Sequence, residues 1–207
     1  MQVVKEIKTI KKSTEVKLKE KNSVFIGNAY FISSDNEVQS ILGMVKKKFF
    51  DANHHCYAYK LSNDNFKFSD DGEPNGTAGK RILNAIEHFN LRNCLVVVTR
   101  YFGGTKLGVG PLGKTYYSTA LQTLNSSELI IHKPYYIVKI NCDFVFLNLL
   151  HRFIAKYDCN VIETKYEENV KFTFYINAND KDLFFSEIIE ASNGKIEISA
   201  KDDVIFL

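Results

Sequence analysis

Residues 69–114 read SDDGEPNGTAGKRILNAIEHFNLRNCLVVVTRYFGGTKLGVGPLGK, and this stretch decides the fold. It holds two glycine-interrupted loops, each followed by an amphipathic helix. Apolar residues at helical spacing predict the first helix over residues 77–89. Gly110-Pro111 opens the second helix, because proline suits the first helical position. Between them, residues 95–99 form a continuous apolar run, which is typical of a strand buried on both faces.

The rest of the chain extends this pattern in both directions. Residues 23–32 predict a strand, and Ser34, three residues before Glu37, predicts a capped helix start. Val4, Ile7 and Ile10 mark either another strand or an irregular lead-in. The strands and helices predicted for residues 135–207 follow the order β-α-β-β-α-β, which is the ferredoxin-like pattern. The sequence therefore predicts an α+β protein of two domains, 1–134 and 135–207.

Composition narrows the class of protein. The 207 residues are 45% hydrophobic, so the chain can bury a substantial core. Four scattered cysteines without a C-x-x-C pair predict neither a disulfide framework nor a metal site. The N-terminus lacks an apolar signal core, and no apolar run reaches membrane-spanning length. We expect a cytoplasmic protein without a membrane segment, and nothing in the pattern calls for a cofactor.

Charge is distributed unevenly along the chain. Residues 1–134 hold 19 Lys/Arg and 12 Asp/Glu, a net charge of +7. Residues 135–207 hold 8 and 12, a net charge of −4. Either the first half meets an anionic partner, or its basic excess serves only solubility.

An acidic turn precedes the first core helix. Asp70, Asp71 and Glu73 lie there with Gly72, and they either bind a metal, supply a general base or form a solvated turn paired with nearby cations. His54 and its neighbour in the sequence precede a strand. Because adjacent strand residues face opposite sides, at most one of the two histidines points towards the acidic turn, as a ligand, a base or a structural residue.

Cations stand where the helix dipole disfavours them. Lys80 and Arg81 lie in the first turn of one helix, and Lys114 lies near the start of the next. Exposed cations at a helix N-terminus cost roughly 0.3–1 kcal/mol each. Either the acidic turn compensates them, or a bound phosphate or carboxylate does so with the free N–H groups of the helix end.

The loop RYFGGTKLGVG, residues 100–110, combines cations, aromatics and glycines. Gly103 and Gly104 allow close backbone approach to an anion. Arg100 and Lys106 are candidates for phosphate contacts, and Tyr101 or the phenylalanine after it is a candidate for stacking on a base. The spacing fits neither a Walker A loop nor G-x-G-x-x-G. A tight loop with a purely structural role is the alternative.

Three segments carry a family resemblance. They are DANHHCYAYKL (residues 51–61), SDDGEPNGTAGKRIL (residues 69–83) and VVVTRYFGGTKLGVGPLGKTY (residues 96–116). Their order and spacing resemble the signatures of the IMPACT/YigZ family. Arg81 departs from the proline usual in that family. Lys114 replaces an arginine and cannot make a bidentate contact, although its charge is kept.

The resemblance implies a specific architecture. The N-terminal domain is expected to be an α/β sandwich like the second domain of a small-subunit ribosomal protein. The C-terminal domain is expected to be a ferredoxin-like βαββαβ domain akin to one in elongation factor G. Eukaryotic relatives in this family regulate translation.

We therefore expect a translation-associated regulator that is not an enzyme and that binds RNA, the ribosome or another phosphate-bearing partner. Its expected phosphate-binding residues are Lys80, Arg100, Tyr101, Gly103, Gly104, Lys106 and Lys114, with Asp70, Asp71 and Glu73 orienting the cations. One alternative is an enzyme acting on a phosphorylated small molecule or nucleotide, with His54 or Glu73 as acid or base and the acidic turn holding a metal. The other is a protein-interaction module without nucleic acid; the C-terminal domain is the expected site of any protein contact.

Overall fold

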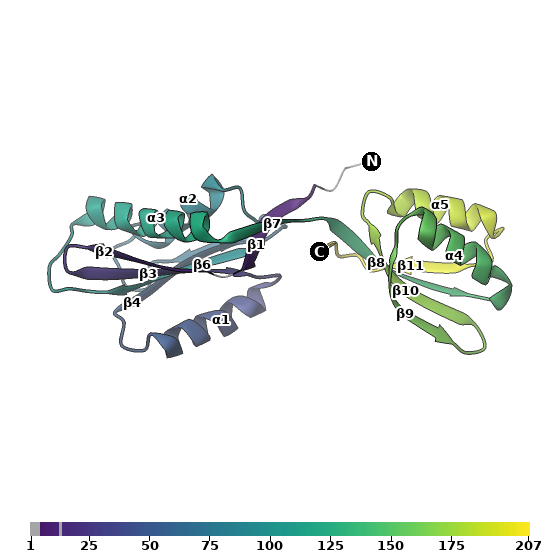
Figure 1. Ribbon diagram of the computed structural model, residues 1–207, viewed down its shortest axis with the longest axis horizontal. Coiled ribbons are helices and arrows are strands. Elements are labelled where there is room, and N and C mark those ends of the chain that lie inside the picture. The colour runs from purple at the N-terminus through teal and green to yellow at the C-terminus, as the bar shows by residue number, and fades with distance from the viewer. Residues whose placement is uncertain (1–4, 13) are drawn as a thin grey trace. The chain divides into compact units, whose positions relative to one another are not determined.

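The computed structural model describes residues 5–12 and 14–207. The chain divides into two compact units, of which the first is Lys8–Ile131 and the second is His132–Leu207 together with the segment up to Ile7. The predicted two-domain α+β architecture is confirmed (Figure 1). None of the helices in the described residues is long and apolar enough to span a bilayer.

The first unit is built on a five-stranded antiparallel sheet. Its strands are, in spatial order, β2 (Glu15–Glu20), β3 (Ser23–Phe31), β6 (Cys94–Tyr101), β4 (His54–Lys60) and β5 (Phe66–Ser69). β6 is central and almost wholly buried, as its apolar run predicts. Its alternate residues pack on opposite faces of the sheet, so one strand contributes to two cores.

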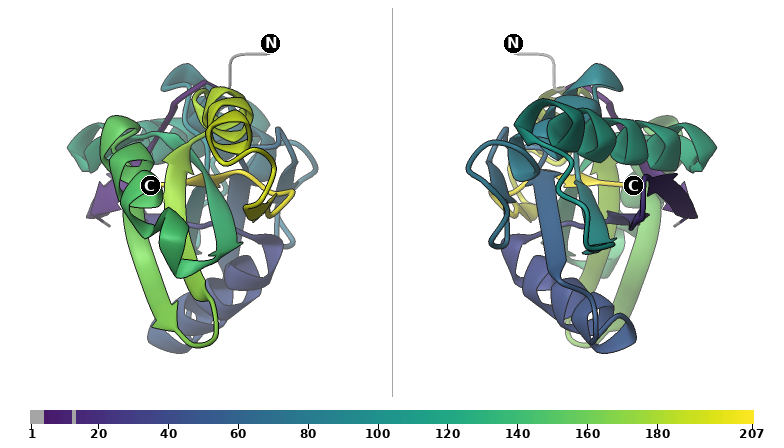
Figure 2. Two further views of the ribbon diagram at one scale, coloured as in Figure 1. Left: turned by 90° about the vertical axis from the view of Figure 1, so that its right-hand side faces the viewer. Right: turned by 90° about the vertical axis from the view of Figure 1, so that its left-hand side faces the viewer.

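Helices cover both faces of this sheet (Figures 1 and 2). α2 (Gly79–His88) and α3 (Val109–Ser126) pack together on one face, around the fully buried Tyr116. α1 (Asp35–Lys48) covers the other face through its buried apolar stripe. The helix predicted from residue 77 begins at Gly79, after the N-cap residue Ala78, whose backbone N–H donates to Asp70.

Two strands pair outside the main sheet. β1 (Ile7–Lys12) pairs with β7 (Glu128–His132). Ile7 and Ile10 lie on β1, so the strand alternative is confirmed for them, while Val4 lies outside the described residues.

The second unit has the expected ferredoxin-like topology. Its elements are β8 (Pro134–Cys142), η1 (Phe144–Phe146), α4 (Leu147–Lys156), β9 (Asn160–Tyr166), β10 (Val170–Asn177), α5 (Lys181–Ala191), β11 (Glu197–Ala200) and β12 (Ile205–Phe206). The four main strands run antiparallel in the order β11-β8-β10-β9. Its core is apolar and centres on Phe184, whose ring meets those of Phe153 and Phe174 at centroid distances of 5.9 and 5.5 Å.

Candidate functional site

The first carboxylate of the acidic turn holds the start of α2. Oδ1 of Asp70 accepts hydrogen bonds from the backbone N–H groups of Ala78 and Gly79, both at 2.8 Å. Its Oδ2 accepts from Gly76 at 2.8 Å. Asp70 therefore supplies the negative charge that this helix end favours, and α2 tolerates cations in its first turn without a bound anion.

The second carboxylate faces the adjacent strand. Oδ2 of Asp71 accepts from the backbone N–H of His55 at 2.6 Å. The carbonyl oxygen of Asp71 lies 2.9 Å from Nδ1 of His54. The two histidines face opposite sides of the sheet, as strand geometry predicts. Nε2 of His55 lies 3.1 Å from the carbonyl oxygen of Phe49, and burial lowers the His55 pKa.

The third carboxylate is buried in an ion pair. Oε1 of Glu73 accepts from a terminal nitrogen of Arg100 at 2.6 Å and from the hydroxyl of Tyr116 at 2.7 Å. The side chains of Glu73 and Arg100 are only 4% and 5% exposed. Sulfur of Cys56 lies 3.3 Å from the same hydroxyl. Burial raises the pKa of both the Cys56 thiol and the Tyr116 phenol, so both stay protonated.

The three acids of the turn therefore serve three different partners. Asp70 binds a helix end, Asp71 binds a strand and Glu73 binds an arginine. Within the described residues, no group of three or more His, Cys, Asp or Glu side chains is placed to hold a metal ion. This geometry does not provide the three-carboxylate metal site of the enzyme alternative.

The structure places Arg100 inside the protein instead of on its surface. Its second terminal nitrogen donates to Oγ of Ser23 at 3.2 Å. Its guanidinium lies between the rings of Phe25 and Phe102, 5.2 and 5.4 Å from their centroids. Arg100 is thus a wall of the site, and in this conformation it offers no exposed cation for a phosphate.

The glycine loop is shaped by one close backbone approach. A Cβ on Gly103 would lie 1.9 Å from the carbonyl oxygen of Asn22, and Gly104 has a positive φ of 79°. Tyr101 points to the α1 side of the sheet, where its hydroxyl donates to Asp51 at 2.8 Å. The exposed aromatic of this loop is Phe102, at 42%. Tyr101, the sequence candidate for stacking, is thus held by Asp51, and the exposed ring at this place is that of Phe102.

These residues line an open pocket of about 420 Å³. His54, Glu73 and Arg100 contribute its polar groups, and Phe102 and Leu112 are among its apolar ones. Lys106, exposed, also lines it, so four of the sequence-predicted residues meet here.

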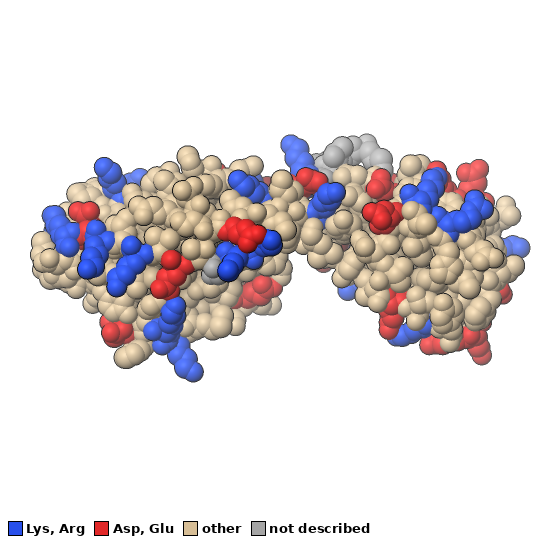
Figure 3. Space-filling view, viewed as in Figure 1, with Lys and Arg blue, Asp and Glu red and all other residues tan. Residues whose placement is uncertain are grey.

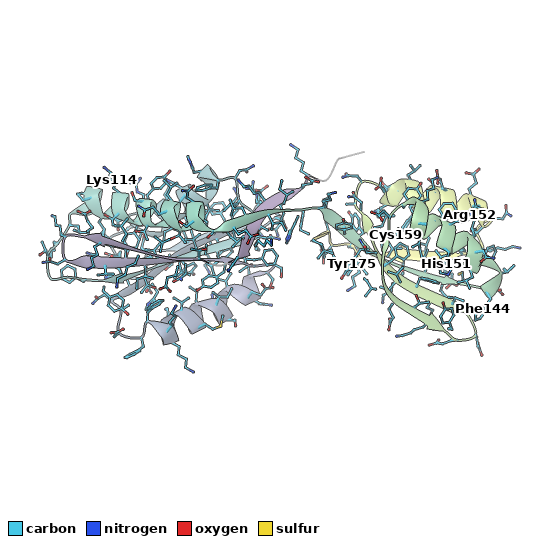
Figure 4. The ribbon with its side chains drawn as sticks, in the orientation of Figure 1. Lys114, Phe144, His151, Arg152, Cys159 and Tyr175 are labelled. Atoms are coloured by element: carbon cyan, nitrogen blue, oxygen red, sulfur yellow. The ribbon has the colours of Figure 1, made fainter. Side chains whose placement is uncertain are left out.

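A second hollow lies between α2 and α3. It has a volume of about 610 Å³, and Arg81, His88 and Lys114 line it together with Asn84 and Tyr117. No acidic side chain of the described chain lines it. Lys114 sits on the first turns of α3 (Figure 4), and basic side chains gather at this end of the unit (Figure 3). Lys80 is exposed on α2 but lines neither hollow.

Sequence reasoning missed several participants in the site. Tyr116 lies on the predicted apolar stripe of α3, and nothing local indicates that its hydroxyl binds Glu73. Ser23 and Cys56 lie in strands, far in sequence from the groups they contact. Arg81 and His88 are seven residues apart, and this spacing alone predicts that they lie on one face of the helix.

Comparison with known proteins agrees with this architecture. Residues 21–124 match the Impact N-terminal domain, and residues 140–195 match a domain of unknown function, DUF1949. The chain is 33% identical over 192 residues to the IMPACT family member YvyE of Bacillus subtilis, covering 92% of this chain and 88% of that protein.

Two further similarities extend over most of the chain. The IMPACT family member YigZ of Escherichia coli is 27% identical over 187 residues, covering 88% of this chain and 92% of that protein. A solved structure described as a hypothetical protein superposes with a TM-score of 0.73 at 25% identity, covering 97% of this chain and all of that one. The resemblance seen in the sequence motifs is confirmed, and the chain belongs to the IMPACT family.

Proposed function

We propose that this protein is a non-enzymatic, translation-associated regulator that binds RNA through the groove between α2 and α3. The observation that carries the proposal is the charge of this groove. Arg81, His88 and Lys114 line it, and no acidic side chain of the described residues does. Lysine and arginine gathered on one surface without acidic neighbours are the electrostatic footprint of phosphate binding.

The first turn of α3 supports the same proposal. Its N-cap, Gly108, has no side chain to bind the free N–H groups, and no acidic residue stands in the first turn. This end differs from the start of α2, where Asp70 occupies that role. Lys106 and Lys114 lie on either side of Gly108 in the sequence, so the positive end of the helix is flanked by cations, as phosphate-binding helix ends often are.

A salt series with a labelled structured RNA tests the proposal. Log affinity should fall linearly with log salt for the parent protein. Arg81→Ala/Lys114→Ala removes two groove cations and should reduce that slope by about 1–2. Lys47→Ala is the matched control, because Lys47 is an exposed cation on α1, across the sheet from the groove. Absent binding, or equal slopes for the double variant and the parent, would overturn the proposal.

A further inference from the structure

We propose that the pocket beside the groove binds an unpaired guanine base, either in a free nucleotide or in an RNA strand. This inference rests on the proposed function, because it makes the pocket the place where a phosphate-bearing ligand inserts its base. Enzymes and binding proteins that take a base out of its stack read it by its Watson–Crick edge and by stacking. The pocket supplies both kinds of contact.

The first reading group is the free oxygen of Glu73. Its Oε1 is occupied by Arg100 and Tyr116, whereas Oε2 accepts no hydrogen bond from any residue that the structure describes. Oε2 is not fully buried, so it keeps some contact with solvent. Glu73 lines the pocket and its side chain is 96% buried, so we infer that this acceptor without a partner in the described chain is available to a ligand there.

The second reading group is His54. Its Nδ1 lies 2.9 Å from the carbonyl oxygen of Asp71, which only accepts, so Nδ1 carries the proton. In the neutral ring, Nε2 is then an acceptor, and it lies 3.9 Å from Oε1 of Glu73. Both residues line the pocket.

Two neighbouring acceptors select a base with two neighbouring donors. Guanine presents its ring N1–H and its 2-amino group side by side on the Watson–Crick edge. Adenine and cytosine place an acceptor beside their amino group, and uracil has no amino group. A site built for hydrogen-bond donors rejects an analogue that lacks one, because its own buried polar groups are left unpaired.

The walls and the open side of the pocket fit the rest of a nucleotide. Phe102 is 42% exposed, and its neighbours Leu107 and Leu112 are apolar, so a planar base finds a stacking surface. Aromatic stacking raises affinity by roughly 5- to 100-fold per base. Lys106 and the uncapped start of α3 favour a phosphate and disfavour a cationic ligand such as an arginine side chain, which would also offer paired donors.

The test edits the ligand first, because Glu73 supports the core and its replacement disturbs folding. Guanosine monophosphate and inosine monophosphate, which differ only in the 2-amino group, are titrated into the full chain by calorimetry. A short single-stranded RNA with one guanine is compared with the same strand carrying inosine there. We expect the guanine member of a pair to bind at least about tenfold more tightly.

The two arms separate the sources of the base. A preference seen with the mononucleotides assigns the pocket to a free nucleotide, and a preference seen only with the strands assigns it to a base in RNA. Equal binding within both pairs overturns the inference. If Arg81→Ala/Lys114→Ala still weakens RNA binding in that case, the proposed function survives and only the base pocket is wrong.

Two variants test whether the preference for guanine arises in this pocket. Phe102→Ala should lower guanine-ligand affinity by roughly tenfold, because it removes the stacking surface. Phe50→Ala is the control, since Phe50 is an 82% exposed phenylalanine of the same unit outside the pocket. Phe102 also packs 5.4 Å from the Arg100 guanidinium, so thermal unfolding of both variants is measured first and affinities are compared well below the lower midpoint. Equal losses of affinity in the two variants would also overturn the inference.

Discussion

The two units of this protein bury different kinds of side chain. In the second unit, the described core consists of apolar residues, and Ser192 is its single buried polar side chain. All other buried polar side chains of the described chain lie in the first unit, among them Glu73, Arg100 and His55. A buried ion pair is weak evidence for stability, because desolvation offsets the attraction between the charges. The first unit therefore contains an ion pair, Glu73–Arg100, that is costly to bury, and both of its residues line a pocket.

The largest effect should come from breaking the buried pair. Glu73→Ala leaves the Arg100 charge inside the unit without its partner, and it should lower the free energy of unfolding of the first unit by about 3–5 kcal/mol. Urea unfolding followed by circular dichroism measures it.

Glu187→Ala is the control from the second unit, where Glu187 binds Lys156 and Tyr157 at a partly exposed position. Its unfolding midpoint should stay close to that of the parent. If both variants lose similar stability, the contrast between the two units is wrong.

A smaller loss is expected from crowding the glycine loop. Gly103→Ala places a Cβ 1.9 Å from the backbone of Asn22, so the loop must shift, at a cost of about 1–3 kcal/mol in unfolding free energy. Gly43→Ala is the matched change inside α1, where the new Cβ meets no atom within 4 Å and no proline follows. That variant should gain roughly 0.5–1 kcal/mol. Differential scanning calorimetry of the pair decides, and a stabilised Gly103→Ala would contradict the close approach.

The two units also differ in how much of their structure the sequence predicts. In the second unit, apolar periodicity predicts the βαββαβ order of elements along the chain, because its core depends on which residues face inwards. In the first unit, the buried strand at residues 95–99 and both core helices are predicted in the same way.

The polar part of the first unit was predicted less well. Local sequence indicates that Arg100 is charged. Whether its side chain is exposed depends on Glu73, 27 residues away, and on Tyr116 of α3, which binds the same carboxylate. The same limit applies to Tyr101, whose side of the sheet is fixed by strand register, and to Phe102, which follows the end of β6. Motifs therefore locate a polar site, and long-range contacts decide which of its members are exposed.

The two aspartate caps offer a third, smaller comparison. Asp70 binds three backbone N–H groups before α2, whereas Asp143 in the second unit binds one, that of Val145. Asp70→Ala should lower the free energy of unfolding by up to about 2 kcal/mol, at the upper end for a helix cap. Asp143→Ala should lower it by about 0.5 kcal/mol. Equal losses in chemical denaturation would show that the extra N–H groups find other partners.

The smallest effect concerns pH. Burial lowers the pKa of His55 from its ordinary value of 6.5, and the Phe49 carbonyl and Asp71 oppose that shift. Below pH 6.5 the unfolded chain therefore binds a proton at this residue that the folded chain does not, so stability is full above that pH and falls on acidification. His55→Gln should flatten the dependence of unfolding free energy on pH between about 7.5 and 5.5. If acid instead stabilises the parent relative to this variant, the field of Asp71 outweighs burial, and the imidazole is held in the first unit as a cation paired with that carboxylate.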